Sequence, residues 1–138
     1  MRRGALAAVL LAGLALTGCA DTPATGPAAS GPRAATAADL LGRWFPADGT
    51  GQGRVFAEFE PDGSWHGSDG CNGQGGTWSL GPDGTVDATA NPSTLIGCEN
   101  LPLASWVATA RRVTLDGPAL VLRDGGGGEL GRLVRGPA

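Results

Sequence analysis

Hydrophobic and polar side chains alternate in several short stretches of this chain. In residues 54–60 (RVFAEFE), Val55, Ala57 and Phe59 lie at every second position, and a two-residue period is typical of a strand with one buried face. Pro61-Asp62-Gly63 then forms a turn signal, because proline presets φ and glycine adopts the left-handed conformation. The same pattern predicts short strands at residues 39–46, 54–60, 64–68, 77–80, 85–90, 113–115, 120–123 and 129–135.

The period changes near residue 103. Leu103, Trp106, Val107 and Ala110 are spaced to lie on one face of a helix, and this is the only helix we expect after the first 38 residues. The predicted fold class is therefore mostly β (α+β): a small, barrel-like antiparallel β-meander with one packed α-helix.

Glycine dominates the centre of the chain, in residues 67–78 (GSDGCNGQGGTW). Glycine permits positive φ and close backbone approach, so we predict a tight loop between two short strands here. Asp69, Asn72 and Gln74 form its candidate binding residues. For Asn72, however, an Asx turn onto its own backbone is favoured over contact with a ligand.

The amino-terminal residues indicate export. Residues 5–16 form an apolar run after Arg2 and Arg3, and this run is shorter than the roughly 20 residues that span a bilayer. We interpret residues 1–18 as a signal peptide. Leu16-Thr17-Gly18-Cys19 resembles a bacterial lipobox, which implies a diacylglycerol on Cys19, cleavage before it and acylation of the new amino terminus; an ordinary signal peptide with a chance cysteine is the alternative.

Residues 20–38 contain mostly Ala, Thr, Pro, Gly and Ser. A segment of this composition buries too little surface to offset its ordering entropy, so we expect a flexible tether that carries a single domain at residues 39–136. The expected location is the extracytoplasmic face of the cell membrane, held by the lipid anchor.

Charge and cysteine content restrict the partners. The chain has 10 basic and 13 acidic residues, without any lysine, which disfavours nucleic acid as a partner; we expect a monomer whose partners are the membrane and an envelope protein. With Cys19 lipidated, Cys71 and Cys98 form an even pair in an oxidising compartment, so a disulfide is expected. The chain lacks a CxxC motif and has a single histidine, so we expect neither a metal nor a cofactor.

Two further groups of residues have competing interpretations. Ser64, His66 and Ser68 would share one face of a strand, but Asp69 would not orient the imidazole from its position, so we predict a surface histidine and no catalysis. The four tryptophans could line a sugar or peptide groove, although a place in the core is favoured for them. They are Trp44, Trp65, Trp78 and Trp106.

The order of the motifs resembles a known family. It runs from Leu41-Gly42-x-Trp44 through Phe59-x-x-Asp62-Gly63 and Gly70-Cys71-Asn72 to Thr94-x-x-x-Cys98. This order is similar to that of the META domain, or heat-shock protein HslJ-like family, over nearly all of residues 39–135. The chain departs from the family in its short helix, where Trp106 is the only aromatic residue, and in the absence of a tyrosine after it.

The resemblance implies a small β-rich envelope domain with a role in stress or antibiotic tolerance and no established catalytic residues. We therefore expect a non-enzymatic accessory lipoprotein. The alternative is an inhibitor or binding module for an extracellular hydrolase (a lysozyme or protease) or for a peptide, and a hydrolase is the least favoured hypothesis.

Overall fold

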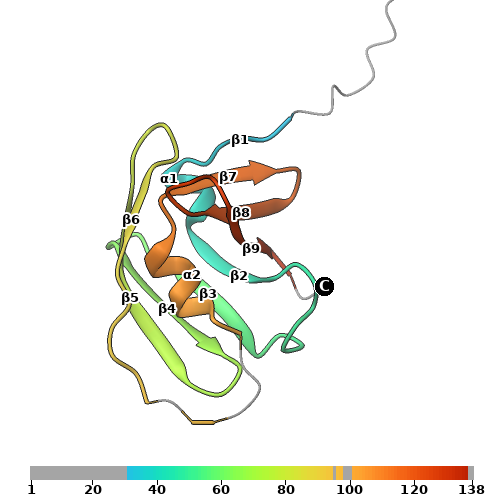
Figure 1. The fold of residues 1–138 in the computed structure, drawn as a ribbon, viewed down its shortest axis with the longest axis vertical. Helices are drawn as coiled ribbons and strands as arrows, with labels where there is room; N and C mark the ends of the chain where they lie inside the picture. Colours follow the sequence, from blue (N-terminus) through green and yellow to red (C-terminus); the bar gives the residue numbers. More distant parts are fainter. Residues whose placement is uncertain (1–30, 95, 98–100, 137–138) are drawn as a thin grey trace, which may run out of the picture.

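The computed structural model describes residues 31–94, 96–97 and 101–136 (Figure 1). In this part of the chain no helix is both long and apolar enough to cross a membrane. The described residues form nine strands and two helices. These are β1 (Arg33–Ala34), α1 (Ala37–Leu40), β2 (Gly42–Pro46), β3 (Val55–Phe59), β4 (Ser64–Asp69), β5 (Gly73–Leu80), β6 (Val86–Ala88), α2 (Leu103–Thr109), β7 (Arg112–Asp116), β8 (Ala119–Arg123) and β9 (Glu129–Val134).

All paired strands are antiparallel, in the order β1-β7-β8-β9-β2-β3-β4-β5-β6. Two meanders, β2 to β6 and β7 to β9, are joined where Phe45 pairs with Val134 in β9. A bridge between Thr85 and Arg112 brings the β6 side of the sheet back to β7, so the sheet curls around its inner face (Figure 1). The mostly β, antiparallel prediction is confirmed.

The turns form where the Pro-Asp-Gly sequences predict them. Gly63 and Gly84 have φ of +83° and +80°, a conformation that glycine adopts without steric cost. In the first turn, the carboxylate of Asp62 accepts a hydrogen bond from the Ser64 backbone N–H at 2.8 Å. Residues 60–63 therefore join β3 to β4, in a register that pairs Phe59 with Trp65.

The core lies inside the curled sheet, and α2 closes one side of it. Alternation in β3 buries the side chains of Val55, Ala57 and Phe59, while α2 packs against β3, β4 and β6 and buries Leu103 and Val107. The predicted helix is confirmed. A second helix, α1, was not expected.

The expected tether contains residues that belong to the domain. β1 pairs with β7, and α1 begins with a capping box in which Thr36 and Asp39 each accept a hydrogen bond from the other's backbone N–H. The side chains of Ala35 and Leu40 are fully buried. The prediction that the tether extends to residue 38 is therefore wrong, because the partner strand β7 lies far away in the sequence.

The glycine-rich stretch is also more regular than expected. β4 runs to Asp69 and β5 begins at Gly73, so residues 70–72 alone connect the strands instead of a loop over residues 67–78. The strand glycines permit close packing: a Cβ on Gly76 would lie 2.0 Å from the Thr89 carbonyl oxygen. Glycine serves close approach of strands here more than loop flexibility.

Candidate functional site

The carboxylate of Asp69 organises the turn between β4 and β5. Its Oδ1 accepts hydrogen bonds from the backbone N–H groups of Cys71 (2.9 Å) and Asn72 (2.7 Å). Its Oδ2 accepts from the side-chain amides of Asn72 and Gln74, both at 3.1 Å. Asp69 is 1% exposed, so the structure directs this carboxylate into the protein and not toward a ligand.

Asn72 connects this turn to the segment after β6. Its side-chain amide donates to Asp69, and its Oδ1 accepts from the backbone N–H of Ile96 at 2.7 Å. The favoured prediction of an Asx turn by Asn72 is wrong, because Asp69 makes that turn instead. The three candidate binding residues Asp69, Asn72 and Gln74 do lie together, but they hydrogen-bond one another.

Cys71 lies within the same turn and is disulfide-bonded. Cys98, its expected partner, and Cys19, the expected lipidation site, lie outside the described residues. The Cys71–Cys98 pairing and the lipid anchor therefore stay predictions.

His66 is exposed, as expected, but it is not isolated. Its Nε2 lies 3.4 Å from an oxygen of Glu58, and its Nδ1 lies 3.8 Å from an oxygen of Glu60. One atom of each of these three residues that could bind a metal ion lies within 4.8 Å of the other two. Arg43 already donates two hydrogen bonds to Glu58, at 2.6 and 2.8 Å. The guanidinium of Arg43 therefore already neutralises this carboxylate. The grouping was not predicted from the sequence, although the hairpin register that pairs Glu58 with His66 would have indicated it.

Three of the four tryptophans are core residues, as the favoured interpretation predicted. Trp44, Trp65 and Trp78 are buried. Each donates its indole N–H to a backbone carbonyl, at 2.7 Å to Leu40, 2.7 Å to Thr89 and 2.9 Å to Ser64 respectively. Buried indoles ordinarily need such a partner.

Trp106 differs from the other three. It is only partly buried, and among the described residues its indole N–H has no hydrogen-bond acceptor. The ring lies over Gly131 of β9, where a Cβ would come within 2.4 Å of its Cε3 atom. Glycine at this position therefore allows the indole to lie directly on the strand backbone.

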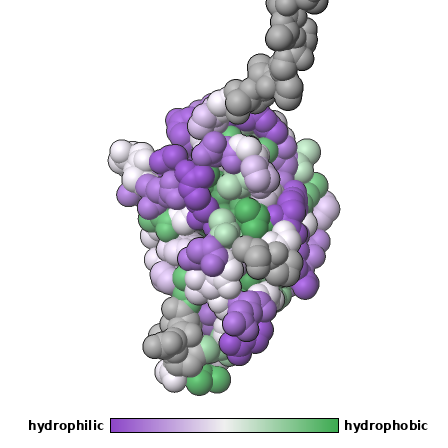
Figure 2. All heavy atoms as spheres, turned by 90° about the vertical axis from the view of Figure 1, so that its right-hand side faces the viewer, coloured by the Kyte–Doolittle hydropathy of each residue, from purple (hydrophilic) through white to green (hydrophobic). Residues whose placement is uncertain are grey.

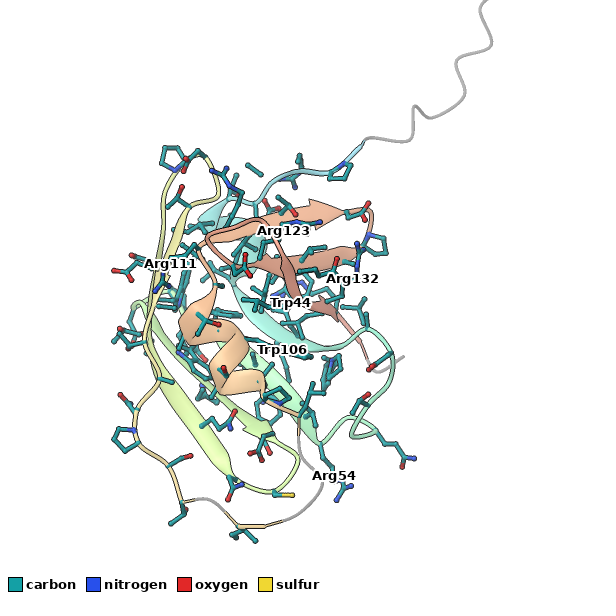
Figure 3. All side chains as sticks on the ribbon, viewed as in Figure 1. Trp44, Arg54, Trp106, Arg111, Arg123 and Arg132 are labelled. Carbon is teal, nitrogen blue, oxygen red and sulfur yellow. The ribbon has the colours of Figure 1, made fainter. Side chains whose placement is uncertain are left out.

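Trp106 lines a groove of about 410 Å³ between α2, β9 and the end of β2. Its other walls include Pro46, Asp48, Leu130 and Arg132. Figure 3 labels Trp106 on α2 and Arg132 on β9. On the face of the molecule shown in Figure 2, hydrophobic residues lie exposed among hydrophilic ones. A volume of this size is within the range of small ligand sites, about 300–1,000 Å³.

The charges at the groove differ in how they are compensated. The guanidinium of Arg132 contacts Glu129 at 2.8 Å and Asp116 at 2.9 Å, and these hydrogen bonds raise the pKa of Arg132. Asp48 accepts hydrogen bonds from Thr50, which lower the pKa of its carboxyl group. In the described part of the chain Asp48 has no ion-pair partner, so it contributes an uncompensated negative charge.

Comparison of the chain with protein-family models, curated proteins and solved structures gives no match. The resemblance to the META domain thus stays a prediction from the sequence motifs.

Proposed function

We propose that this chain is a lipoprotein held on the extracytoplasmic face of the membrane, whose META/HslJ-like β domain is a non-enzymatic binding module. The lipobox-like sequence that ends at Cys19 supports the anchor. The short segment between Cys19 and β1 would hold the domain close to the membrane surface, where envelope proteins are accessible to it.

The groove beside Trp106 is the observation that carries the binding role. It combines a partly exposed indole, apolar walls at Pro46 and Leu130, and a few charged groups. Binding sites generally have such a composition, with apolar and aromatic walls and a small number of polar groups that orient the ligand. Because Trp106 rests on Gly131, its ring is already in place before a ligand arrives, which reduces the entropic cost of binding.

The arrangement around His66 supports binding in preference to hydrolysis. Asp69, the acid nearest in sequence on the carboxyl side, hydrogen-bonds within its own buried turn. His66 instead faces Glu58 and Glu60 across the β3–β4 hairpin, and no serine hydroxyl of the described residues hydrogen-bonds to it. A triad requires a nucleophile, a base and an orienting acid in one chain of contacts.

Crosslinking in intact cells tests this proposal. The wild-type chain is compared with Trp106→Leu, which keeps an apolar contact with Gly131 but removes the flat indole, and with Ser79→Ala on the exposed side of β5 as a matched control. We expect one dominant crosslinked envelope protein with the wild type and the control, and its loss with Trp106→Leu. Capture that does not depend on Trp106 would refute the binding role of the groove.

The anchor has a separate test. Cys19→Ala should release the protein or leave an unprocessed precursor, as seen by cell fractionation and mass spectrometry. Normal processing with unchanged membrane retention would refute lipidation. If the binding module is an inhibitor, the crosslinked partner should be a hydrolase, and this hydrolase should lose activity when the domain binds to it.

A further inference from the structure

The domain places its own arginines against aromatic rings. The guanidinium of Arg135 lies 3.8 Å from the centre of the Trp44 ring, and that of Arg43 lies 4.2 Å from the centre of the Phe56 ring. A cation over an aromatic face is attracted by the ring quadrupole. Among the described residues Trp106 has no such cation, although its ring is more exposed than that of Trp44.

The charge at the groove determines which ligand suits this ring. Arg132 and Arg123 form ion pairs with Asp116 and Glu129, at 2.8 to 3.9 Å, so this network contains two positive and two negative groups. Asp48 is the remaining charged residue of the groove wall, and it is negative. A cationic group would therefore find here both a partly exposed indole without a cation of its own and a carboxylate that has no ion-pair partner among the described residues.

Resting on the proposed function, we propose that the groove receives an arginine side chain from an extended segment of a partner protein. The planar guanidinium stacks on the indole of Trp106, and its remaining N–H groups donate to the carboxylate of Asp48. Guanidinium groups suit this role because they are planar, weakly hydrated and able to stack on aromatic faces while they hydrogen-bond at their edge.

The charge of the whole chain favours the same partner. Without Arg2 and Arg3 of the signal peptide, 8 basic residues remain against 13 acidic ones, a formal charge of −5. A negative domain attracts basic partners and repels acidic ones before contact. The apolar walls at Pro46 and Leu130 would cover the methylene groups of the arginine side chain.

The experiment follows the indole N–H signals of the ¹⁵N-labelled full chain in detergent micelles by NMR. The Trp106 signal is assigned as the one that is lost in Trp106→Leu. Three probes are titrated: acetyl-Gly-Arg-Gly-amide, the same peptide with citrulline, which is a neutral isostere of arginine, and a neutral N-acetylglucosamine trimer. We expect the arginine peptide to shift the Trp106 signal selectively, and the citrulline peptide to bind roughly tenfold more weakly.

Asp48→Asn is the matched variant, because its amide oxygen can still accept the hydrogen bond from Thr50. It should weaken binding of the arginine peptide about threefold to tenfold, while Asp62→Asn, which alters a similar turn elsewhere, should leave binding unchanged. Equal binding of the arginine and citrulline peptides, no effect of Asp48→Asn, or a response to the sugar alone would overturn the inference. If crosslinking depends on Trp106 but the arginine peptide does not bind, the proposed function stands and the arginine assignment falls.

Discussion

Replacing Asp69 with asparagine should strongly destabilise the domain although it changes almost no volume. Oδ1 would still accept from the backbone N–H groups of Cys71 and Asn72. At the Oδ2 position, however, an NH₂ group would face the side-chain amides of Asn72 and Gln74, which are both donors. Two of these four hydrogen bonds would therefore become contacts between donors.

The two neighbouring amides differ in how they can respond. Among the described residues the buried Oε1 of Gln74 has no hydrogen-bond partner, so Gln74 can turn its amide over and accept from the new NH₂ group. Asn72 cannot do so, because its Oδ1 already accepts from the backbone of Ile96 at 2.7 Å. One buried donor contact therefore persists, at a cost of about 1–3 kcal/mol. The bonds that remain also lose their charged acceptor, which brings the expected loss to about 2–4 kcal/mol.

Urea unfolding under non-reducing conditions, followed by tryptophan fluorescence, measures this loss. The midpoint should fall while the slope with denaturant stays constant, because the same surface is exposed on unfolding. Asp62→Asn is the control, since Asp62 makes a similar turn at the exposed end of the β3–β4 hairpin, and it should leave the midpoint nearly unchanged. A midpoint for Asp69→Asn equal to that of the wild type would refute the argument that the buried carboxylate holds the turn.

Two further predictions concern stability. Gly76→Ala would place a Cβ 2.0 Å from the Thr89 carbonyl oxygen, whereas a Cβ on Gly73 in the same strand would have nothing within 4 Å. In urea unfolding, Gly76→Ala should lower the free energy of unfolding by roughly 2 kcal/mol or more, and Gly73→Ala should change it little. Equal effects of the two substitutions would contradict the packing argument. Hydrogen bonds from Arg33 and from the helix cap lower the pKa of Asp39, so its stabilising effect is present at neutral pH and is lost as the pH falls below about 4. Asp39→Asn should lower the free energy of unfolding by about 1 kcal/mol at pH 7, and the difference in stability from the wild type should narrow in acid. A difference in stability that stays constant with pH would contradict this prediction.

Local patterns in the sequence predicted the parts of the fold that depend on local physics. The alternation in β3, the turn at Gly63 and the spacing of Leu103 and Val107 in α2 each follow from a few neighbouring residues. Strand β1 was not predicted, because that strand exists only through its pairing with β7. The capping box between Thr36 and Asp39 was a readable signal for α1, since a threonine followed three residues later by an acid is typical of a helix start.

The candidate site was predicted only in part, for a related reason. Asp69, Asn72 and Gln74 were predicted as candidate binding residues, but whether their polar atoms face outward depends on Ile96, which approaches from a distant segment. The helical spacing of Trp106 is compatible with a buried core position as well as with an exposed position in a groove. Its exposure is decided by Gly131 in β9, over which the indole lies, and helix periodicity carries no information on that strand.

If the chain is anchored through Cys19 as we propose, the attachment of β1 has a mechanical consequence. Any tension between the membrane and the domain would enter at Arg33 and pull on a strand of two residues at the edge of the sheet. Detaching residues 33–35 breaks their few hydrogen bonds to β7 and adds about 10 Å of chain. The buried Leu40 in α1 then resists further extension. Under tension, β1 would therefore detach first and lengthen the linker, while the groove beside Trp106 stays folded.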